Sequence, residues 1–368
     1  MNKVEAFMKR KGVVLSLHRY GIDALGAMAQ GLFCTLLVGT ILNTLGQQLN
    51  IGFLTRTIVT ISSGANAISY TIGGLASALC GPGIAVAVGA ALCAPPLVLF
   101  SLIPVGFAAN AIAGAGGPLA VYIVTLFAAE IGKLISKETR VDILVTPCAT
   151  ILAGCALASL VAAPIGRAAQ SVGVAIMWAT ELQPFFMGML VSAIIGIALT
   201  LPISSAAICA ALGLTGLAGG AAVAGCCAQM VGFAVMSFKE NRWGGLVAQG
   251  VGTSMLQMPN IIKNPRIFLP PIFASMITGP LATCVFKLQM NGAPVSAGMG
   301  TCGFVGQIGV YTGWISDVAS GAKAAVTPMD WIGLILICFI LPAVLSTLIC
   351  EAMRRMGMIR EGDLTLDL

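Results

Sequence analysis

Long apolar stretches run along almost the whole chain and are separated by short polar or glycine-rich breaks. A membrane-spanning helix needs about 20 apolar residues, so these stretches allow roughly 8 to 11 such helices. We expect spans at residues 25–45, 65–79, 83–100, 118–135, 141–163, 185–201, 206–220, 221–238, 268–288 and 331–353. Residues 46–63 and 166–183 are amphipathic links between them. The pattern predicts an all-α polytopic membrane protein with about ten transmembrane helices.

The composition excludes a soluble globular domain. Of the 368 residues, 58% are hydrophobic and only 9% are charged, with a mean hydropathy of +0.99. A soluble domain carries about 25% charged residues, and no soluble packing of this length buries so much apolar chain. We therefore expect the protein in a lipid bilayer, as a multi-pass protein of the cell inner membrane.

The net charge of +6 does not indicate a nucleic-acid partner, because the basic residues lie at the ends of the apolar stretches. They are Lys9, Arg10, Lys11, Lys133, Lys137, Arg140, Lys239, Arg242, Lys263, Arg266, Arg354, Arg355 and Arg360. Since cytoplasmic loops are rich in Lys and Arg, we expect both termini in the cytoplasm and an even number of crossings. Residues 1–24 predict an amphipathic segment on the inner membrane surface, and residues 354–368 a cytoplasmic tail.

Catalytic, metal and cofactor chemistry is not indicated. The 12 Cys are scattered along apolar stretches without Cys-x-x-Cys spacing, and His18 is the only His. Such cysteines are typical of small core residues rather than of a zinc site or a disulfide framework. The chain offers no paired carboxylates and no Ser/His/Asp set. We therefore expect no enzyme, no cofactor and no bound metal.

Residues 245–271 are the most informative stretch, because they are apolar enough for membrane depth and yet polar and broken. Amides and hydroxyls alternate there with glycines and prolines: Gln249, Gly250, Gly252, Thr253, Ser254, Gln257, Pro259, Asn260, Asn264 and Pro265. Each unpaired polar group in hydrocarbon costs several kcal/mol, so such backbone persists only inside protein or along a wet cavity. Basic residues flank both ends, which predicts a re-entrant element. Uncharged amides suit a neutral polar solute.

Other polar residues join the candidate substrate-binding set. Residues 106–117 and 292–313 are also glycine-rich and broken, and an acid near membrane depth is a functional candidate. The full set is Asn66, Asn110, Glu181, Gln249, Thr253, Ser254, Gln257, Asn260 and Gln307. Alternatives stay open: the amides could cap broken backbone or join helices, and Glu181 could face lipid headgroups.

The chain also indicates two related halves, residues 25–180 and 181–353. Ile61-Ser-Ser-Gly-Ala precedes one Gly/Ala-rich run and Ile203-Ser-Ser-Ala-Ala precedes another. Each half begins with a clean apolar stretch and later contains a proline-rich break and a glycine-rich one. Paired interrupted segments in matching halves are the best sequence indication of a transporter site.

Several motifs carry a family resemblance: GVGTSMLQ at 250–257, PNIIKNP at 259–265, the pair Pro270–Pro271, and GMGTCGFVGQ at 298–307. With them the chain, from about residue 31 to 353, resembles the second family of phosphotransferase-system sugar permease domains (EIIC-like), which includes the membrane regulator PfoR. The resemblance implies an all-helical, dimeric membrane domain with two related halves and re-entrant hairpins.

The chain departs from better-understood sugar permease domains of this system, which use a membrane-embedded His and Glu at the sugar. Here His18 lies in the N-terminal amphipathic segment, and we expect no fused domain that carries a phosphorylated His or Cys. Separate phosphotransferase subunits could phosphorylate the solute, the permease could be uncoupled, or the protein could be a sensor.

The sequence thus predicts a permease that moves a small polar solute, such as a sugar, by alternating access. Its partners would be the solute, the lipid bilayer, a second copy of the chain in a homodimer, and separate phosphotransferase subunits. Two alternatives remain: a PfoR-like sensor that binds a solute without transport, and a channel built from uncharged re-entrant loops.

Overall fold

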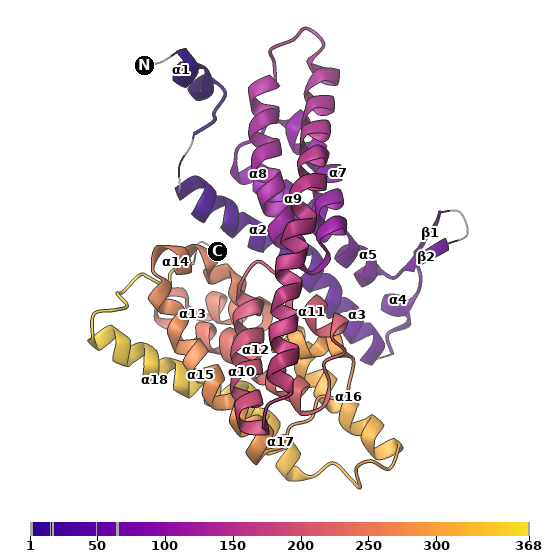
Figure 1. Cartoon of the computed structure of the whole chain (residues 1–368), viewed down its shortest axis with the longest axis vertical. Helices are drawn as coiled ribbons and strands as arrows, with labels where there is room; N and C mark the ends of the chain where they lie inside the picture. Colours follow the sequence, from indigo (N-terminus) through magenta and orange to yellow (C-terminus); the bar gives the residue numbers. More distant parts are fainter. Residues whose placement is uncertain (1–2, 15, 17, 49, 64–65, 367–368) are drawn as a thin grey trace. The chain divides into compact units, whose positions relative to one another are not determined.

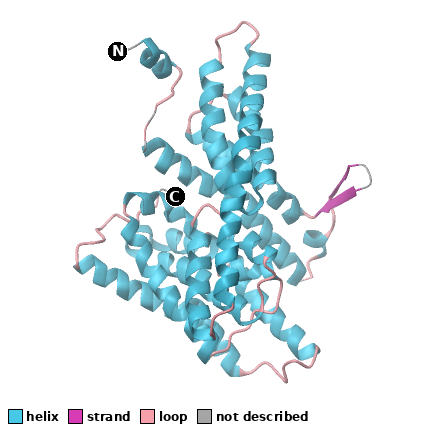
Figure 2. Ribbon diagram, in the orientation of Figure 1, coloured by secondary structure: helices cyan, strands magenta, loops and turns pink. Residues whose placement is uncertain are grey.

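The computed structural model describes residues 3–14, 16, 18–48, 50–63 and 66–366. Helices make up almost all of the described chain (Figures 1 and 2). The chain divides into two compact units, Met1–Arg167 and Ala168–Leu368. The division falls inside one long helix, α9, which spans Asp142–Thr180. Each unit is described separately below, and the relation between the two halves as a sequence repeat stays a prediction.

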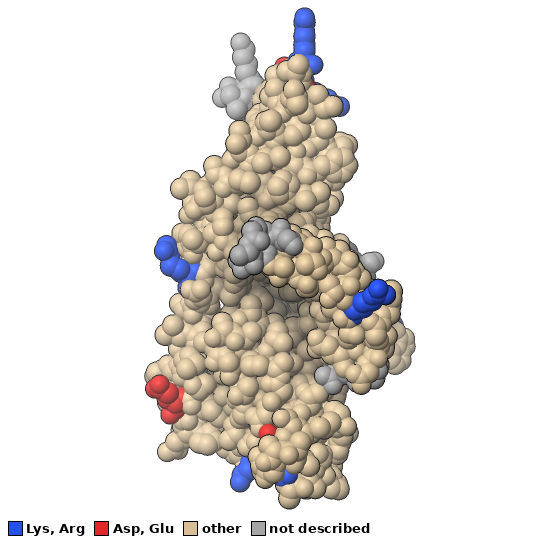
Figure 3. All heavy atoms as spheres, turned by 90° about the vertical axis from the view of Figure 1, so that its right-hand side faces the viewer, with Lys and Arg blue, Asp and Glu red and all other residues tan. Residues whose placement is uncertain are grey.

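The expectation of an all-α polytopic membrane protein is confirmed. Among the described residues, six helical stretches are long and apolar enough to cross a membrane, and a pair bent by 55°, Ile72–Ala78 with Cys80–Ala91, would be a seventh. The six are Arg19–Gln47, Pro96–Ile135, Asp142–Thr180, Gly216–Met236, Pro265–Val285 and Pro328–Arg355. The expected number of ten is not confirmed. On the face shown in Figure 3, charged side chains are few and lie at isolated points.

The first unit contains the helices up to the start of α9. They are α1 (Lys3–Arg10), α2 (Ala24–Leu32), α3 (Val38–Gln48), α4 (Gly52–Thr55), α5 (Ile72–Ala78), α6 (Cys80–Ala91), α7 (Pro96–Ala113) and α8 (Gly117–Ile135). Glycines let these helices approach closely, as small residues do in membrane bundles. A Cβ on Gly81 of α6 would collide with the Gly106 carbonyl of α7, and one on Gly39 of α3 would meet the Gly73 carbonyl of α5 at 2.6 Å.

Two expected features of the first unit are wrong. Residues 65–79 do not form one span: Val59–Ser63 (β1) and Asn66–Tyr70 (β2) pair as an antiparallel hairpin, and helix begins only at Ile72. Alternating β-branched and polar residues in 59–63 and 66–70 are the strand signal that the apolar content obscured. Ile61 and Ile68 are 54% and 56% exposed, so the hairpin contributes no core.

Residues 106–117 are likewise not irregular. Helix α7 continues to Ala113, and only Gly114, with φ +54°, breaks it before α8 begins. Gly132 of α8 packs against Val98 of α7, so the two helices form an antiparallel hairpin. The glycines expected to break the helix instead provide close packing and the turn.

Helix α9 joins two expected segments, 141–163 and 166–183, into one helix despite Pro147 and Pro164. Prolines inside membrane helices are tolerated because neighbouring groups re-satisfy the freed carbonyls. Its apolar side chains Ile143, Leu152 and Leu160 are each more than 70% exposed. Such an unpacked apolar surface is that of a helix facing lipid.

The second unit contains the rest of the helices. They are α10 (Pro184–Thr200), α11 (Ser205–Ala211), α12 (Gly216–Met236), α13 (Phe238–Val247), α14 (Met258–Lys263), α15 (Leu269–Pro280), α16 (Val305–Ala319), α17 (Pro328–Ile335) and α18 (Leu341–Arg355). The expected spans 206–220 and 221–238 are misdivided. The chain breaks at Gly213 and Gly216, both at positive φ, and α12 then runs unbroken to Met236.

Helix α12 is the centre of the second unit. In the most apolar 18 residues of this helix, 94% are buried. The helix packs against α10, α15 and α18. Gly225 lies directly on the carbonyl of Ser192 in α10, where a Cβ would not fit. The Ser192 hydroxyl in turn donates to the Ser275 carbonyl of α15 at 2.7 Å. Small residues and hydroxyls therefore hold this bundle together, as expected in lipid.

Candidate functional site

The stretch 245–271 folds as a series of short helical pieces rather than one helix. After α13 come a π-helical turn (Ala248–Gly252), a 3-10 turn (Ser254–Gln257), α14, a second 3-10 turn (Pro265–Phe268) and α15. Thr253 is extended between the first two, and its hydroxyl accepts from the Met255 amide at 3.2 Å. Pro259 lies in the first turn of α14, where a missing N–H is harmless. The glycines and prolines thus break the helix where the sequence indicated.

Three amides of this stretch form a connected chain in the interior. Gln257 Nε2 donates to Gln249 Oε1 at 2.9 Å, and Asn260 Nδ2 donates to Gln257 Oε1 at 2.8 Å. Gln249 Nε2 donates onward to the Ser237 hydroxyl at 2.8 Å and to the Gly245 carbonyl at 3.0 Å. Gln249 and Gln257 are fully buried and Asn260 is 6% exposed. We call Gln249, Gln257 and Asn260 the amide chain.

The amide chain ends on backbone from far along the sequence. Gln257 Nε2 also donates to the Leu364 carbonyl at 3.0 Å, and Asn260 Nδ2 donates to the Thr365 carbonyl at 2.8 Å. Asn241 of α13 adds a donor to the Leu364 carbonyl at 2.7 Å. Sequence reasoning missed Asn241 and did not connect these amides with residues 358–366, because nothing in the local pattern indicates a partner more than a hundred residues away.

Ser254 belongs to a second polar group, deeper against α10 and α12. Its hydroxyl lies 2.8 Å from the Thr200 hydroxyl, and Thr200 Oγ1 lies 3.4 Å from Gln229 Oε1. All three side chains are fully buried. Thr200 and Gln229 were missed by the sequence analysis. Gln229 is the one amide in the otherwise apolar α12, and that isolation was the available signal.

Gln307 lies in the other broken stretch, 292–313, which also packs on α12. Two 3-10 turns, Pro294–Gly298 and Cys302–Phe304, precede α16 there. Gln307 Nε2 donates to Cys227 Sγ of α12 at 3.1 Å. Gly300, at φ +54°, lies so close to Cys226 of α12 that a Cβ would be 2.7 Å away. The turns Ala248–Gly252 and Cys302–Phe304 touch, so the two broken stretches meet beside α12.

Some buried polar atoms in this region have no hydrogen-bond partner among the described residues. They are Gln229 Nε2, Thr301 Oγ1 and Gln307 Oε1. We call Gln229, Thr301 and Gln307 the unpaired set. None of these side chains carries a charge, and they combine an amide donor, an amide acceptor and a hydroxyl. Leaving a buried donor or acceptor unpaired costs about 1–3 kcal/mol of folding free energy. The presence of each unpaired atom therefore calls for an explanation, such as a bound ligand.

The remaining predicted residues lie elsewhere. Asn66 opens the strand β2, and its side chain is outside the described part of the chain. Asn110 lies near the end of α7, where its backbone carbonyl accepts from Gly114 and its side chain packs on Gly81 and Gly117. Glu181 follows the last turn of α9 and is exposed.

The first unit has its own buried group, and this one is charged. Lys133 of α8, with a side chain only 1% exposed, pairs with Glu130 at 2.9 Å and donates to the Leu92 carbonyl at 3.1 Å. Tyr20 donates to Glu130 at 3.1 Å. This group joins α8 to α6 and to the start of the first span. Its charges make it unlike the neutral polar groups of the second unit.

An ion pair also anchors the N-terminal helix within the first unit. Arg10 lies 2.8 Å and Lys11 2.5 Å from the Glu138 carboxylate, in the loop after α8. The hydrogen bond from Lys11 lowers the pKa of Glu138 below its ordinary 4.5, and the positive charges of both basic residues add to the effect. The amphipathic segment is thus attached to the end of α8 by charge.

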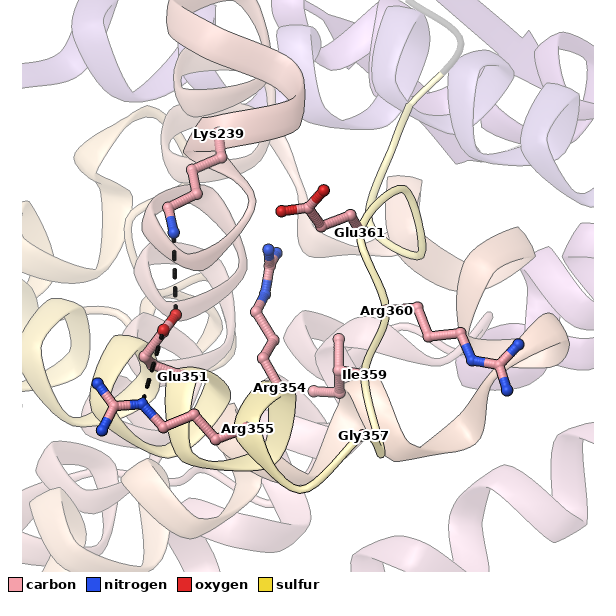
Figure 4. A pocket seen from close by; sticks show the side chains of 8 residues that line it. All are labelled: Lys239, Glu351, Arg354, Arg355, Gly357, Ile359, Arg360 and Glu361. Atoms are coloured by element: carbon pink, nitrogen blue, oxygen red, sulfur yellow. Dashed lines mark ion pairs between the residues drawn. The ribbon is translucent and has the colours of Figure 1, made fainter.

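A surface cavity of about 460 Å³ opens where α18 ends (Figure 4). Its walls are Lys239, Glu351, Arg354, Arg355, Gly357, Ile359, Arg360 and Glu361. Glu351 lies 3.9 Å from both Lys239 and Arg355, while Arg354 is held by Glu240 at 2.5 Å. In Figure 4 Arg360 points away from the others. The cationic groups are largely balanced by carboxylates, so the cavity is no strong anion site.

Comparison with known proteins gives one result. The family described as "Phosphotransferase system, EIIC" matches residues 22–366, nearly the whole chain. Neither curated proteins nor solved structures gave a significant match. The match confirms the resemblance seen in the motifs at 250–265 and 298–307.

Proposed function

The chain belongs to the phosphotransferase-system EIIC family, and we propose on this premise that it moves a small, uncharged polar solute across the inner membrane by alternating access. Membership and the apolar spans make it a multi-pass membrane protein of the permease type. The observation that carries the finer proposal is the unpaired set, where two broken stretches pack on α12.

The chemistry of the unpaired set favours a polyhydroxylated solute. A sugar or polyol hydroxyl both donates and accepts, so one molecule can pair with an amide N–H, an amide oxygen and a threonine hydroxyl. An ionic solute would need a countercharge, and the side chains of this group are neutral. Each of these atoms that a solute pairs would offset about 1–3 kcal/mol.

Broken helices around a central site are the usual way in which transporters alternate access. Gly252, at the end of the π-helical turn, and Gly300, at φ +54°, are the joints at which the two broken stretches would separate from α12. The proposal includes both termini in the cytoplasm, a homodimer, and separate phosphotransferase subunits, which family membership favours. A sensor would bind the solute in the same place without releasing it on the other side.

Uptake into proteoliposomes by purified full-length protein tests the proposal. The probes are radiolabelled D-glucose, D-galactose and D-mannitol. We expect saturable uptake of at least one probe, and a loss of about tenfold in its apparent affinity in Thr301→Val, because one hydrogen bond to the solute is lost. Saturable binding without uptake would support a sensor, and uptake that does not saturate would support a channel.

The matched control is Thr125→Val in α8. Thr125 Oγ1 is also buried without a partner among the described residues, but it belongs to the first unit, whereas the unpaired set belongs to the second. Both substitutions replace a buried hydroxyl by a methyl of the same shape, so both should keep or raise thermal stability. The proposal is wrong if Thr301→Val leaves uptake unchanged, or if Thr125→Val lowers it equally.

A further inference from the structure

Residues 358–366 lie on the polar groups of the broken stretch as a bound peptide would. We call them the latch segment. Its hydrogen bonds to side chains come from four residues: Asn241, Gln257, Asn260 and Asn264. Asn241 holds it on both sides, because its Nδ2 donates to the Leu364 carbonyl at 2.7 Å and its Oδ1 accepts from the Leu366 amide at 2.8 Å.

Recognition of the latch segment is mostly through its backbone. The accepting atoms are the carbonyls of Met358, Leu364 and Thr365, together with the Asp363 carboxylate. Leu364 and Ile359 anchor the segment by their side chains, which are 0% and 2% exposed. Carbonyl oxygens offer these amides the same acceptor chemistry that a solute hydroxyl oxygen would offer.

The latch segment has two glycine joints, one just before it and one in its backbone. Gly357 at φ +70° and Gly362 at φ +90° flank its first half, and glycine tolerates such backbone without strain. That half borders the cavity at the end of α18, so open space lies on one side of it (Figure 4). The helix end itself is fixed, because Arg354 pairs with Glu240 and both side chains are nearly buried. The joints therefore lie between a fixed helix and an anchored end.

The amide chain connects the latch segment with the deeper polar group. Ser254 and Gln257 are the first and last residues of one 3-10 turn. A 3-10 helix rises about 2 Å per residue, so the two residues lie about 6 Å apart along its axis. Ser254 contacts Thr200, which leads to Gln229 of the unpaired set. A solute that reaches Gln229 along this side would pass the donors of Gln257 and Asn260, which the latch segment occupies.

We infer that the latch segment is an internal competitor: it occupies Gln257 and Asn260 in place of solute and must leave before solute can pass. This inference rests on the proposed transport function for its consequence, but the occlusion itself can be tested without a solute. Release would turn about the two glycines. It would free the Nε2 of Gln257 and the Nδ2 of Asn260, each of which keeps one partner within the amide chain.

The perturbation is Asn241→Ala, because Asn241 holds the latch segment and is outside the proposed solute set. The matched control is Asn291→Ala. Asn291 also makes two hydrogen bonds that span the unit, to Asp317 at 2.8 Å and from the Gly216 amide at 3.1 Å, but none to the latch segment. A second variant, Leu364→Asp, removes the buried side chain next to the amide chain without changing any residue of that chain.

The first measurement is hydrogen–deuterium exchange of the purified full-length protein in nanodiscs. Losing two hydrogen bonds should raise exchange in residues 358–366 about tenfold in Asn241→Ala, with faster exchange in 257–264 as well. Leu364→Asp should act in the same direction, and Asn291→Ala should leave both peptides unchanged. Unchanged exchange in both latch variants would overturn the inference.

The second measurement is initial uptake of the three labelled sugars. If the released form is a minor population, uptake should rise by a factor similar to that of exchange, about tenfold. Faster exchange in 358–366 with protected 257–264 and unchanged uptake would also overturn the inference. Faster exchange in both peptides with no uptake of any sugar, even by the wild type, would instead support occlusion and count against the proposed transport function.

Discussion

Gln257 and Asn260 provide a quantitative test of the amide chain. Gln257→Ala removes a donor to Gln249 Oε1 and to the Leu364 carbonyl and the acceptor of Asn260 Nδ2. The Leu364 carbonyl keeps Asn241 and Asn260 Nδ2 keeps Thr365, so Gln249 Oε1 is the atom left alone. One orphaned buried acceptor and two weakened contacts should cost about 2–4 kcal/mol.

Asn260→Ala breaks fewer contacts. It orphans Gln257 Oε1, while the Thr365 carbonyl lies on an exposed residue and can turn to water. The expected cost is about 1–3 kcal/mol. Because the bond between the two amides is lost in either single variant, the double variant should be less destabilised than the sum, by about 1–2 kcal/mol.

Equilibrium unfolding by SDS in mixed micelles measures all three variants, and affinity for a transported sugar is measured on the same preparations. Gln257→Ala combined with Asn291→Ala is the control pair, since these residues share no partner among the described residues. Additivity of Gln257→Ala and Asn260→Ala within about 0.5 kcal/mol would show that the amides are not linked. Stability loss with unchanged affinity would assign them to holding the backbone, and loss of affinity would place them on the solute path.

Further expectations concern the packing and charges. Gly225→Ala should destabilise the protein by about 1–3 kcal/mol, because the added Cβ has no room against α10. Gly173→Ala should not, because a Cβ there would make only ordinary van der Waals contacts. Unfolding by SDS measures the stability of both variants. Lys133→Met should cost about 3–5 kcal/mol in the same assay, because it strands a carboxylate in the apolar interior. The hydrogen bond from Lys11 lowers the pKa of Glu138, so the ion pair that attaches α1 is fully formed above pH 4.5 and is lost as the pH falls through the lowered pKa. Hydrogen exchange of α1 should therefore become faster over that range. Exchange of α1 that does not change with pH would contradict this expectation.

Local signals predicted the broken stretch but not its partners. The π-helical turn ends at Gly252, and Pro259 lies in the first turn of α14, where its missing N–H is tolerated, so the breaks fall beside the residues that indicated them. In contrast, only Gly114 of the stretch 106–117 breaks a helix, while Gly106, Gly116 and Gly117 lie in close packing contacts. A glycine's role depends on what faces it, and Gly81 against Gly106 is a contact that no window of sequence contains.

Hydropathy had a similar limit. The runs 25–45 and 331–353 lie within membrane-spanning helices of the structure. A continuous apolar run of that length forms a helix in lipid, because the helix satisfies all its backbone hydrogen bonds internally. Residues 65–79 have about the same apolar content as the run 25–45, yet the period-two pattern around Ile61 and Ile68 forms an exposed hairpin. Composition was enough to predict a membrane protein, whereas the period-two alternation of side chains was needed to predict strands rather than a helix around residues 59–70.

The candidate site separates into two kinds of polar residue that look alike in the sequence. Gln257 and Asn260 make their side-chain hydrogen bonds to each other, to Gln249 and to the latch segment, so their polarity is accounted for without a solute. Gln229, Thr301 and Gln307 each keep one buried atom unpaired, and no bond among the described residues accounts for it. Since the cost of such atoms is borne continuously by the folded protein, the second kind is where a bound solute has most to offer, and the first kind is where access to it can be controlled.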